Sequence, residues 1–172
     1  MKAQILNPFL EAIHEVLSKE VQVNVKRGEL SLDARSYTTE DVTALISMIG
    51  QVEGNVLLSL SQATAKQVVG RMLGEEVSEF NELAQSGISE LGNVIVGQAS
   101  VRLARAGYQT NISPPALILG EGAKLSTLDY PRLVVPLATE MGLVTIHLAL
   151  KESTVTHQPG TQLKTPERPE AG

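Results

Sequence analysis

The sequence predicts an α/β (α+β) fold in which two long helices lie on one face of a largely antiparallel six-stranded sheet. Two internal matches predict it. Residues 22–32 resemble residues 109–119, and residues 54–60 resemble 142–148, at offsets that differ by a single residue. Such self-similarity indicates two copies of one supersecondary unit. Each copy reads as a helix followed by three strands, so we expect two pseudo-symmetric αβββ repeats.

The elements of the first copy follow from periodicity and from typical helix boundaries. Apolar spacing predicts an amphipathic helix over 5–18, with Pro8 in its first turn, where proline is tolerated. Alternating or β-branched apolar residues predict strands over 21–32, 42–49 and 54–60. Ser61 is a typical N-cap for a further helix that runs to Leu73, and Gly74 is a typical stop.

The second copy begins with a long amphipathic helix over 79–106, for which Gly107 is a natural end. Strands are expected over 109–119, 132–139 and 143–150. We therefore assign residues 1–152 to one domain. Residues 153–172 are rich in Pro, Thr, Gln and Gly and lack apolar periodicity, so we expect a disordered C-terminal tail.

Composition excludes several classes of function. The 172 residues contain no Cys, which rules out disulfides, thiol nucleophiles and Cys-ligated metals. A net charge of −5 without a basic cluster argues against nucleic acid or an anionic membrane as partner. The three histidines are scattered without ligand spacing, so we expect no metal site. No apolar run approaches the length of a membrane span, and the N-terminus does not resemble a signal peptide, so a cytoplasmic protein is expected.

The helix over 79–106 carries a polar stripe about 100° wide. Its members are Glu82, Ser86, Ser89, Glu90, Asn93, Gly97 and Ser100. The opposite side carries Phe80, Ala84, Ile88, Leu91, Ile95 and Ala99, which we expect to be buried. Glu90 and Asn93 are neighbours at i, i+3, and Gly97 puts no bulk beside them. The stripe is thus flat, with one carboxylate and one carboxamide at its centre.

An ordinary solvated helix face is the alternative interpretation of this stripe. Against it stands the presence of Gly87, Gly92, Asn93 and Gly97 within one helix. Glycine costs about 1 kcal/mol relative to Ala in a helix interior, and Asn competes there for backbone hydrogen bonds. We interpret these four residues as chosen for something other than stability.

The pattern Ser86-x3-Glu90-x2-Asn93, with Pro114-Pro115 a little over twenty residues later, resembles the CheC/CheX/FliY family of chemotaxis phosphatases. The stretches 89–97 and 111–115 are most similar to its CheX members. The αβββ repeat also matches a CheC-like fold, so the resemblance covers roughly residues 3–151.

The resemblance implies an enzyme that removes the phosphoryl group from an aspartyl phosphate on a CheY-type response regulator. Asn93 would orient the attacking water, and Glu90 would pair with a lysine of the regulator. The implied partner-binding surface includes Ser86, Ser89, Gly97, Pro114 and Pro115. Mg²⁺ would belong to the regulator, with no cofactor in this chain, and the resemblance also implies a homodimer joined through its sheets. Strands over 132–139 and 143–150 are apolar enough to need cover if they were bare edges.

The side-chain chemistry is consistent with these roles. Phosphoryl transfer needs an in-line nucleophile and charge stabilisation, with little covalent work from the protein. A neutral carboxamide does not repel phosphoryl oxygens, and its oxygen can accept a hydrogen bond from water and fix its direction. Because an amide cannot take a proton near neutral pH, Asn93 is better read as a positioning residue than as a base.

The first copy carries a degenerate form of the motif, Asn7-x3-Glu11-x2-His14, with His in place of the amide. We interpret it as an ordinary half-exposed helix face, which leaves one site per chain. Two other functions stay open from the sequence. The stripe could dock a phosphorylated regulator without catalysis, as an adaptor, or the chain could resemble the flagellar switch component FliY.

Overall fold

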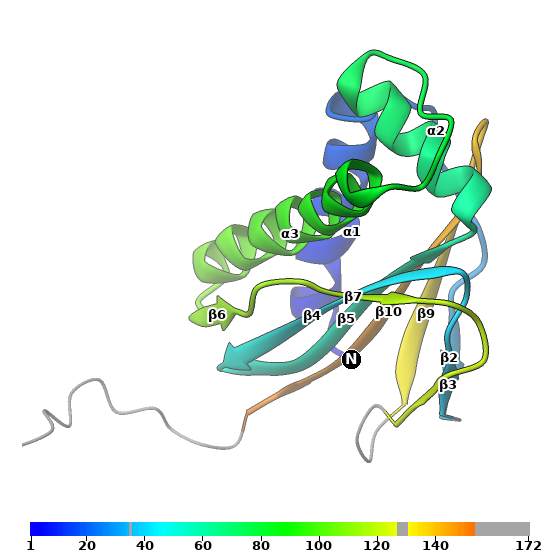
Figure 1. The fold of residues 1–172 in the computed structure, drawn as a ribbon. Helices are drawn as coiled ribbons and strands as arrows, with labels where there is room; N and C mark the ends of the chain where they lie inside the picture. The colour runs from blue at the N-terminus through cyan, green and yellow to red at the C-terminus, as the bar shows by residue number, and fades with distance from the viewer. Residues whose placement is uncertain (35, 127–130, 154–172) are drawn as a thin grey trace, which may run out of the picture.

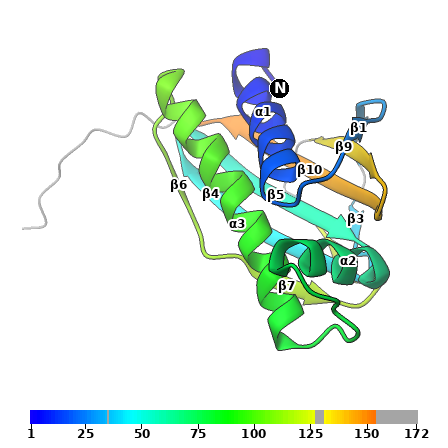
Figure 2. The same cartoon turned by 90° about the horizontal axis from the view of Figure 1, so that it is seen from above.

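Three helices cover one face of an antiparallel sheet in the computed structural model, which describes residues 1–34, 36–126 and 131–153 (Figure 1). The helices are α1 (Ala3–Lys19), α2 (Gln62–Leu73) and α3 (Glu82–Arg105). Seen from above, α1 and α3 lie side by side across the strands, and α2 packs near the first turns of α3 (Figure 2). The predicted fold class is confirmed, whereas the sequence repeat itself stays a prediction.

The main sheet has six rows, built in the described residues from eight strands. The row order is β1-β9-β10-β5-β4-β6, with β2 also paired to β9 and β7 also paired to β4. The strands are β1 (Lys26–Arg27), β2 (Ser31–Asp33), β4 (Val42–Gly50), β5 (Val52–Leu60), β6 (Thr110–Ile112), β7 (Ala116–Leu119), β9 (Arg132–Thr139) and β10 (Gly142–Glu152). A separate pair, β3 (Tyr37–Thr38) with β8 (Lys124–Leu125), was not expected from the sequence.

The strands predicted over 21–32 and 109–119 lie at the two edges of the sheet, and each is broken into two short strands, which corrects the expected ranges. Residues 21–25 form no strand, and Gln22 adopts a left-handed φ of 56°, which strand geometry does not allow. On the other edge, Pro114 and Pro115 separate β6 from β7. Proline has no N–H to donate to the ladder, so the pairing with β4 is interrupted there.

Helix boundaries follow from local caps. The Ser61 side chain accepts a hydrogen bond from the backbone N–H of Thr64, and Gly74 ends α2 in a left-handed conformation, as predicted. Helix α3 begins at Glu82, three residues later than expected, because the Asn81 side chain accepts from the backbone N–H of Ala84 and caps it there.

Two of the helix glycines are packing residues, so our interpretation of Gly87 and Gly92 was wrong. A Cβ at Gly87 would lie 2.8 Å from a methyl group of Val69 on α2. A Cβ at Gly92, which is buried, would lie 3.0 Å from Cδ1 of Ile46 on β4. These glycines let α3 approach its neighbours closely, whereas Gly97 has open space beside it, with only Ile112 Cδ1 at 3.9 Å.

The sheet face without helices holds a buried polar cluster. Arg132 Nη2 donates to Asp33 Oδ2 at 2.8 Å, and Arg132 Nε donates to Nδ1 of His147 at 3.4 Å. The proton of the His147 ring therefore lies on Nε2, 3.3 Å from Ser59 Oγ. Burial, followed by the charge of Arg132, lowers the pKa of His147 to about 4 and keeps the ring neutral at pH 7. These groups satisfy one another.

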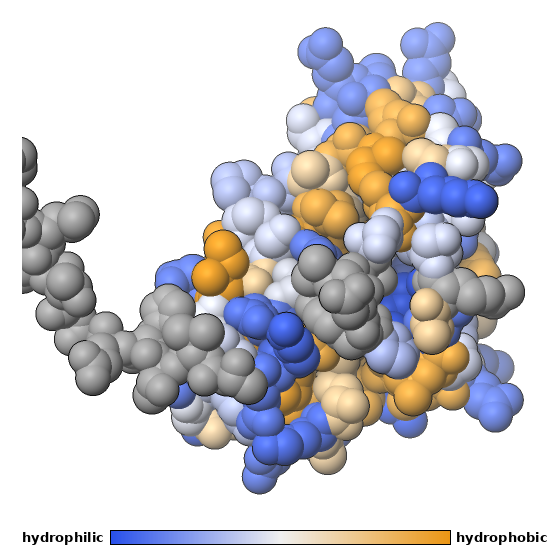
Figure 3. Space-filling model, turned by 90° about the horizontal axis from the view of Figure 1, so that it is seen from below, coloured by the Kyte–Doolittle hydropathy of each residue, from blue (hydrophilic) through white to orange (hydrophobic). Residues whose placement is uncertain are grey.

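The exterior of this helix-free side alternates apolar and charged areas (Figure 3). Arg132, His147 and Ser59 are buried, and Asp33, which is half-buried, pairs with Arg132.

Strands β9 and β10 lie inside the sheet, which corrects the premise that they are bare edges. Each is paired along both sides, β9 with β1, β2 and β10, and β10 with β9 and β5. The edges are β1 with β2 and β6 with β7. At the chain's C-terminal end, the Ser153 N–H still donates to the Gln51 carbonyl, and the rest of the predicted tail, 154–172, lies outside the described residues.

Candidate active site on helix α3

The outward side of α3 is the predicted polar stripe. Glu82, Ser86 and Glu90 are exposed, and Ser89, Asn93, Gly97 and Ser100 are half-buried. On the opposite side, Ala84, Ile88, Leu91, Ile95 and Ala99 are buried in the core against the sheet. The helical period therefore separates the two faces as expected, and packing of the apolar face fixes the direction in which the stripe points.

Glu90 is exposed and Asn93 is half-buried at the centre of α3. Within the part of the chain that the structure describes, neither side chain has a hydrogen-bond or ion-pair partner. They lie one turn apart on neighbouring positions, and Gly97 leaves the next turn without a side chain. The carboxylate and the carboxamide are therefore both available to a second molecule.

Strand β6 flanks this stripe and leads the Pro-Pro segment toward it. Ser100 Oγ lies 2.9 Å from Thr110 Oγ1, and the next contact along the strand is Ile112 beside Gly97. The chain thus runs back along α3 toward its N-terminus, and Pro114 and Pro115 follow β6 in the sequence. Pro114 is exposed and Pro115 half-buried.

The turn before the prolines is held firmly to β4. The Ser113 N–H donates to the Ser47 carbonyl at 2.9 Å, and the Ser47 N–H donates to Ser113 Oγ at 3.0 Å. This reciprocal pair fixes the backbone where the ladder is interrupted. The backbone that leads into the Pro-Pro segment is therefore fixed to β4.

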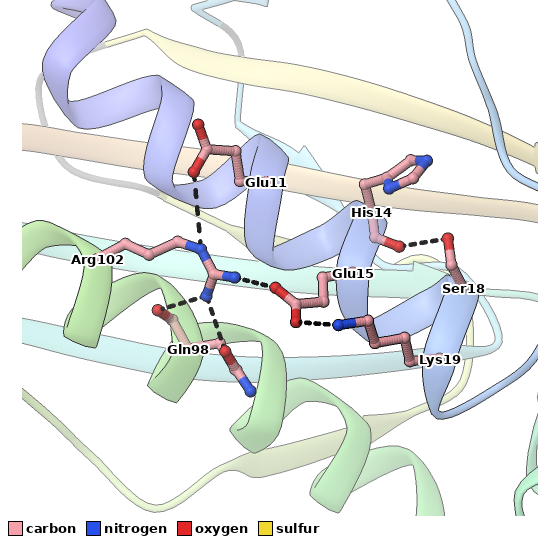
Figure 4. A network of polar contacts seen from close by, with 7 residues as sticks. All are labelled: Glu11, His14, Glu15, Ser18, Lys19, Gln98 and Arg102. Carbon is pink, nitrogen blue, oxygen red and sulfur yellow. Dashed lines mark hydrogen bonds and ion pairs between the residues drawn. The ribbon is translucent and has the colours of Figure 1, made fainter.

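The corresponding residues of α1 are placed differently. Glu11 forms an ion pair with Arg102 of α3, with Oε2 and Nε 3.7 Å apart, and Arg102 also contacts Glu15 and the Gln98 side chain (Figure 4). The His14 ring is exposed and points away from this network, while its backbone carbonyl accepts from Ser18 Oγ at 2.6 Å. The Glu11 carboxylate therefore has an intramolecular partner, although its side chain is 68% exposed.

Two aliphatic residues on the outward side of α3 are not among the predicted site residues. Leu83 and Val101 are each 54% exposed. They lie 18 residues apart, which is five full turns, so both point in nearly the same direction as Glu90. The 18-residue spacing of Leu83 and Val101 could have been recognised in the sequence as an aliphatic pair on one side of the helix.

The described residues of the site supply one carboxamide, one carboxylate and a flat surround. In residues 1–34, 36–126 and 131–153, no group of three or more His, Asp or Glu side chains is placed to hold a metal ion. No helix in the same residues is long and apolar enough to cross a membrane. A carboxamide such as that of Asn93 can orient a water, and a carboxylate such as that of Glu90 can pair with a cation.

Comparison with known proteins gives consistent matches. A family model described as chemotaxis phosphatase CheX matches residues 42–138. The CheY-P phosphatase CheX of Thermotoga maritima is 30% identical over 128 residues, which cover 74% of this chain and 83% of that protein.

Solved structures show the same fold. CheX in the CheX–CheY–BeF3–Mg²⁺ complex from Borrelia burgdorferi aligns with a TM-score of 0.76 and 27% identity, covering 86% of this chain and 98% of that one. A CheC-like superfamily protein from Shewanella sp. PV-4 aligns with a TM-score of 0.79 and 24% identity over 88% of this chain and 99% of that one. FliY of Thermotoga maritima shares the fold at a TM-score of 0.65 and 17% identity, covering 84% of this chain and 86% of that one.

Proposed function

This chain belongs to the family of the chemotaxis phosphatase CheX, and we propose that it hydrolyses the aspartyl phosphate of a CheY-type response regulator. The observation that carries the proposal is the pair Glu90 and Asn93, which lie one turn apart on the polar stripe and have no partner among the described residues. A carboxylate and a carboxamide that lie together without an intramolecular partner can bind groups of a second molecule.

In the proposed mechanism, the regulator docks so that its phosphorylated aspartate faces Asn93. The Asn93 carboxamide oxygen accepts a hydrogen bond from one water and holds that water in line with the phosphorus–oxygen bond to be broken. Because the amide is neutral, it enters a site that is already anionic without adding repulsion. The water's oxygen forms the new bond to phosphorus, the aspartate carboxylate leaves with the bonding electrons, and both protons of the water leave on the released phosphate.

Glu90 is assigned to association with the regulator. An exposed carboxylate one turn from Asn93 can pair with a lysine across an interface, where it sets the register and the approach of the partner. Ser86, Ser89, Gly97, Pro114 and Pro115 are proposed as the surrounding contact surface. Mg²⁺ is assigned to the regulator, where it would neutralise phosphoryl charge. The relative from Borrelia burgdorferi was solved with CheY, BeF3 and Mg²⁺, which supports this choice of partner.

The test uses a purified CheY-type regulator that has been labelled at its aspartate with a phosphoryl donor. Loss of the label is followed with and without this chain, and with the Asn93→Ala variant. We expect acceleration by the wild-type chain and not by the variant. An unchanged rate of loss with a chain that still binds the phosphorylated regulator would overturn catalysis and support the adaptor function instead.

The proposal includes a homodimer and a cytoplasmic location, both expected from the sequence. The mass of the chain in solution at micromolar concentration, measured by light scattering, tests the dimer, and a monomer mass would contradict it. A dimer that continues the sheet must use β1 with β2 or β6 with β7, because these are the edge rows.

A further inference from the structure

The polar centre of α3 is framed at both ends by exposed aliphatic side chains. Leu83 and Val101 are each 54% exposed, although core residues of the same helix are at most 1% exposed. Val94, half-exposed, lies between them on the same side. Single exposed aliphatic residues are common on protein surfaces. Here Leu83 and Val101 lie on the same side of α3, with Glu90 between them along the helix.

The size of this face fits one protein partner. Eighteen residues at 1.5 Å per residue separate Leu83 from Val101 by about 27 Å. A standard interface buries about 800 Å² on each partner, which corresponds to a patch roughly 30 Å across. One domain centred on Glu90 and Asn93 would therefore cover both aliphatic residues. A small ligand would reach neither.

The charge of the face selects among protein partners. From Asn81 to Val101 the chain contains Glu82 and Glu90 but no Lys or Arg. Against a second copy of itself this face would bring together carboxylates without a cation, which is unfavourable. A partner that offers a cation to Glu90 and apolar surface to either side is complementary to it.

We propose that Leu83 and Val101 are docking residues that hold the phosphorylated response regulator across α3, with Glu90 and Asn93 at the centre of the contact. This inference rests on the proposed function and adds the residues that supply affinity. Aliphatic side chains buried at such an interface stabilise the bound ground state and the transition state equally. Their loss should raise KM and leave kcat unchanged.

The experiment compares the double variant Leu83→Gln with Val101→Gln against the single variant Leu143→Gln. Glutamine keeps the charge and a good helix propensity, so α3 should fold normally. Leu143 is a matched control because it is also 54% exposed but lies on β10, away from α3. We measure KM and kcat for the phosphorylated regulator, and the Kd of the BeF3-loaded regulator by calorimetry.

We expect the double variant to raise KM and Kd by about 10-fold or more, because two aliphatic contacts are lost from one interface. Its kcat should stay within about twofold of wild type, and the Leu143→Gln control should match wild type throughout. Unchanged KM and Kd in an active double variant would overturn the docking role and leave the proposed function standing. A wild-type chain that binds without hydrolysis, together with a double variant that does not bind, would support the docking face and overturn the hydrolysis. A change in the mass of the double variant with unchanged Kd would show a contact between copies and overturn the inference.

Discussion

Helices α1 and α3 lie side by side on the same face of the sheet, and each carries a glutamate followed three residues later by a polar side chain. On α1 the glutamate, Glu11, is paired with Arg102, whereas on α3 Glu90 and Asn93 have no partner in the described residues. The same i, i+3 spacing of a glutamate and a polar residue therefore does not by itself define a functional site. A motif can act on a second molecule only when its own fold leaves it unoccupied.

The arginine that occupies Glu11 comes from α3 itself. The Arg102 side chain is only 17% exposed and reaches Glu11, Glu15 and Gln98 together. Partly buried ion-pair networks of this kind hold geometry better than single surface pairs. One flank of α3 therefore holds the neighbouring helix, while its solvent-facing side carries the proposed contact with the regulator.

The largest expected effect is at Asn93. Asn93→Ala should lower kcat at least about 100-fold with little change in Kd, because only the positioning of water is lost. Asn93→Asp is the sharper variant, since it keeps the shape but adds a negative charge beside the phosphoryl group. It should be impaired to a similar degree. Activity of Asn93→Asp at or above wild type, measured as phosphate release at saturating regulator, would show that this residue acts as a base.

A smaller effect is expected at Glu90. Glu90→Ala should raise KM for the phosphorylated regulator by about 10-fold, which is about 1.4 kcal/mol of binding, and should change kcat less. The effect should diminish with added salt because it comes from a charge pair. Glu11→Ala is the matched control on α1. If both variants raised KM alike, the proposed difference between the two helices would be wrong.

Arg102→Ala tests the structural side of the comparison. Removing the shared partner of Glu11 and Glu15 should lower the free energy of unfolding by about 1 kcal/mol, with phosphatase activity within about twofold of wild type. Arg105→Ala, at an exposed position three residues away, serves as the control and should leave stability unchanged. Urea unfolding of both variants gives the comparison. Equal stabilities for the two would mean that the network does not contribute.

The smallest effect is expected from the double variant Glu11→Ala with His14→Ala. If only α3 carries a working motif, this variant should keep activity within about twofold of wild type. Thermal unfolding is followed in parallel to confirm that the fold survives. A large loss of activity with a normal unfolding curve would mean that α1 contributes a second site.

Features set by local periodicity could be predicted from the sequence. The polar stripe of α3, the caps at Ser61 and Gly74, and the four long strands all follow from residues close together in the chain. Gly87 and Gly92 were misinterpreted because the residues that crowd them, Val69 and Ile46, come from other elements. Spacing within one helix carries no information about which neighbour packs against it.

Strand order and side-chain pairing were likewise outside the reach of local patterns. Strands β9 and β10 read as apolar segments whether they lie at an edge or in the middle of a sheet. The pairing of Glu11 with Arg102 joins residues far apart in sequence, so the motif on α1 could only be judged once both helices were placed. The roles of Glu90 and Asn93 in catalysis stay predictions.

The pairing of the first edge row with β9 also bears on how the chain reaches its folded state. Lys26 is opposite Ala138, and Met48 is opposite Ile112, so each half of the sequence supplies an edge row to the other half. During synthesis the emerging N-terminal half cannot complete its sheet until most of the chain has left the ribosome. Such long-range pairings slow folding. We expect the sheet to form only after both halves of the chain are available, and neither half to fold stably on its own.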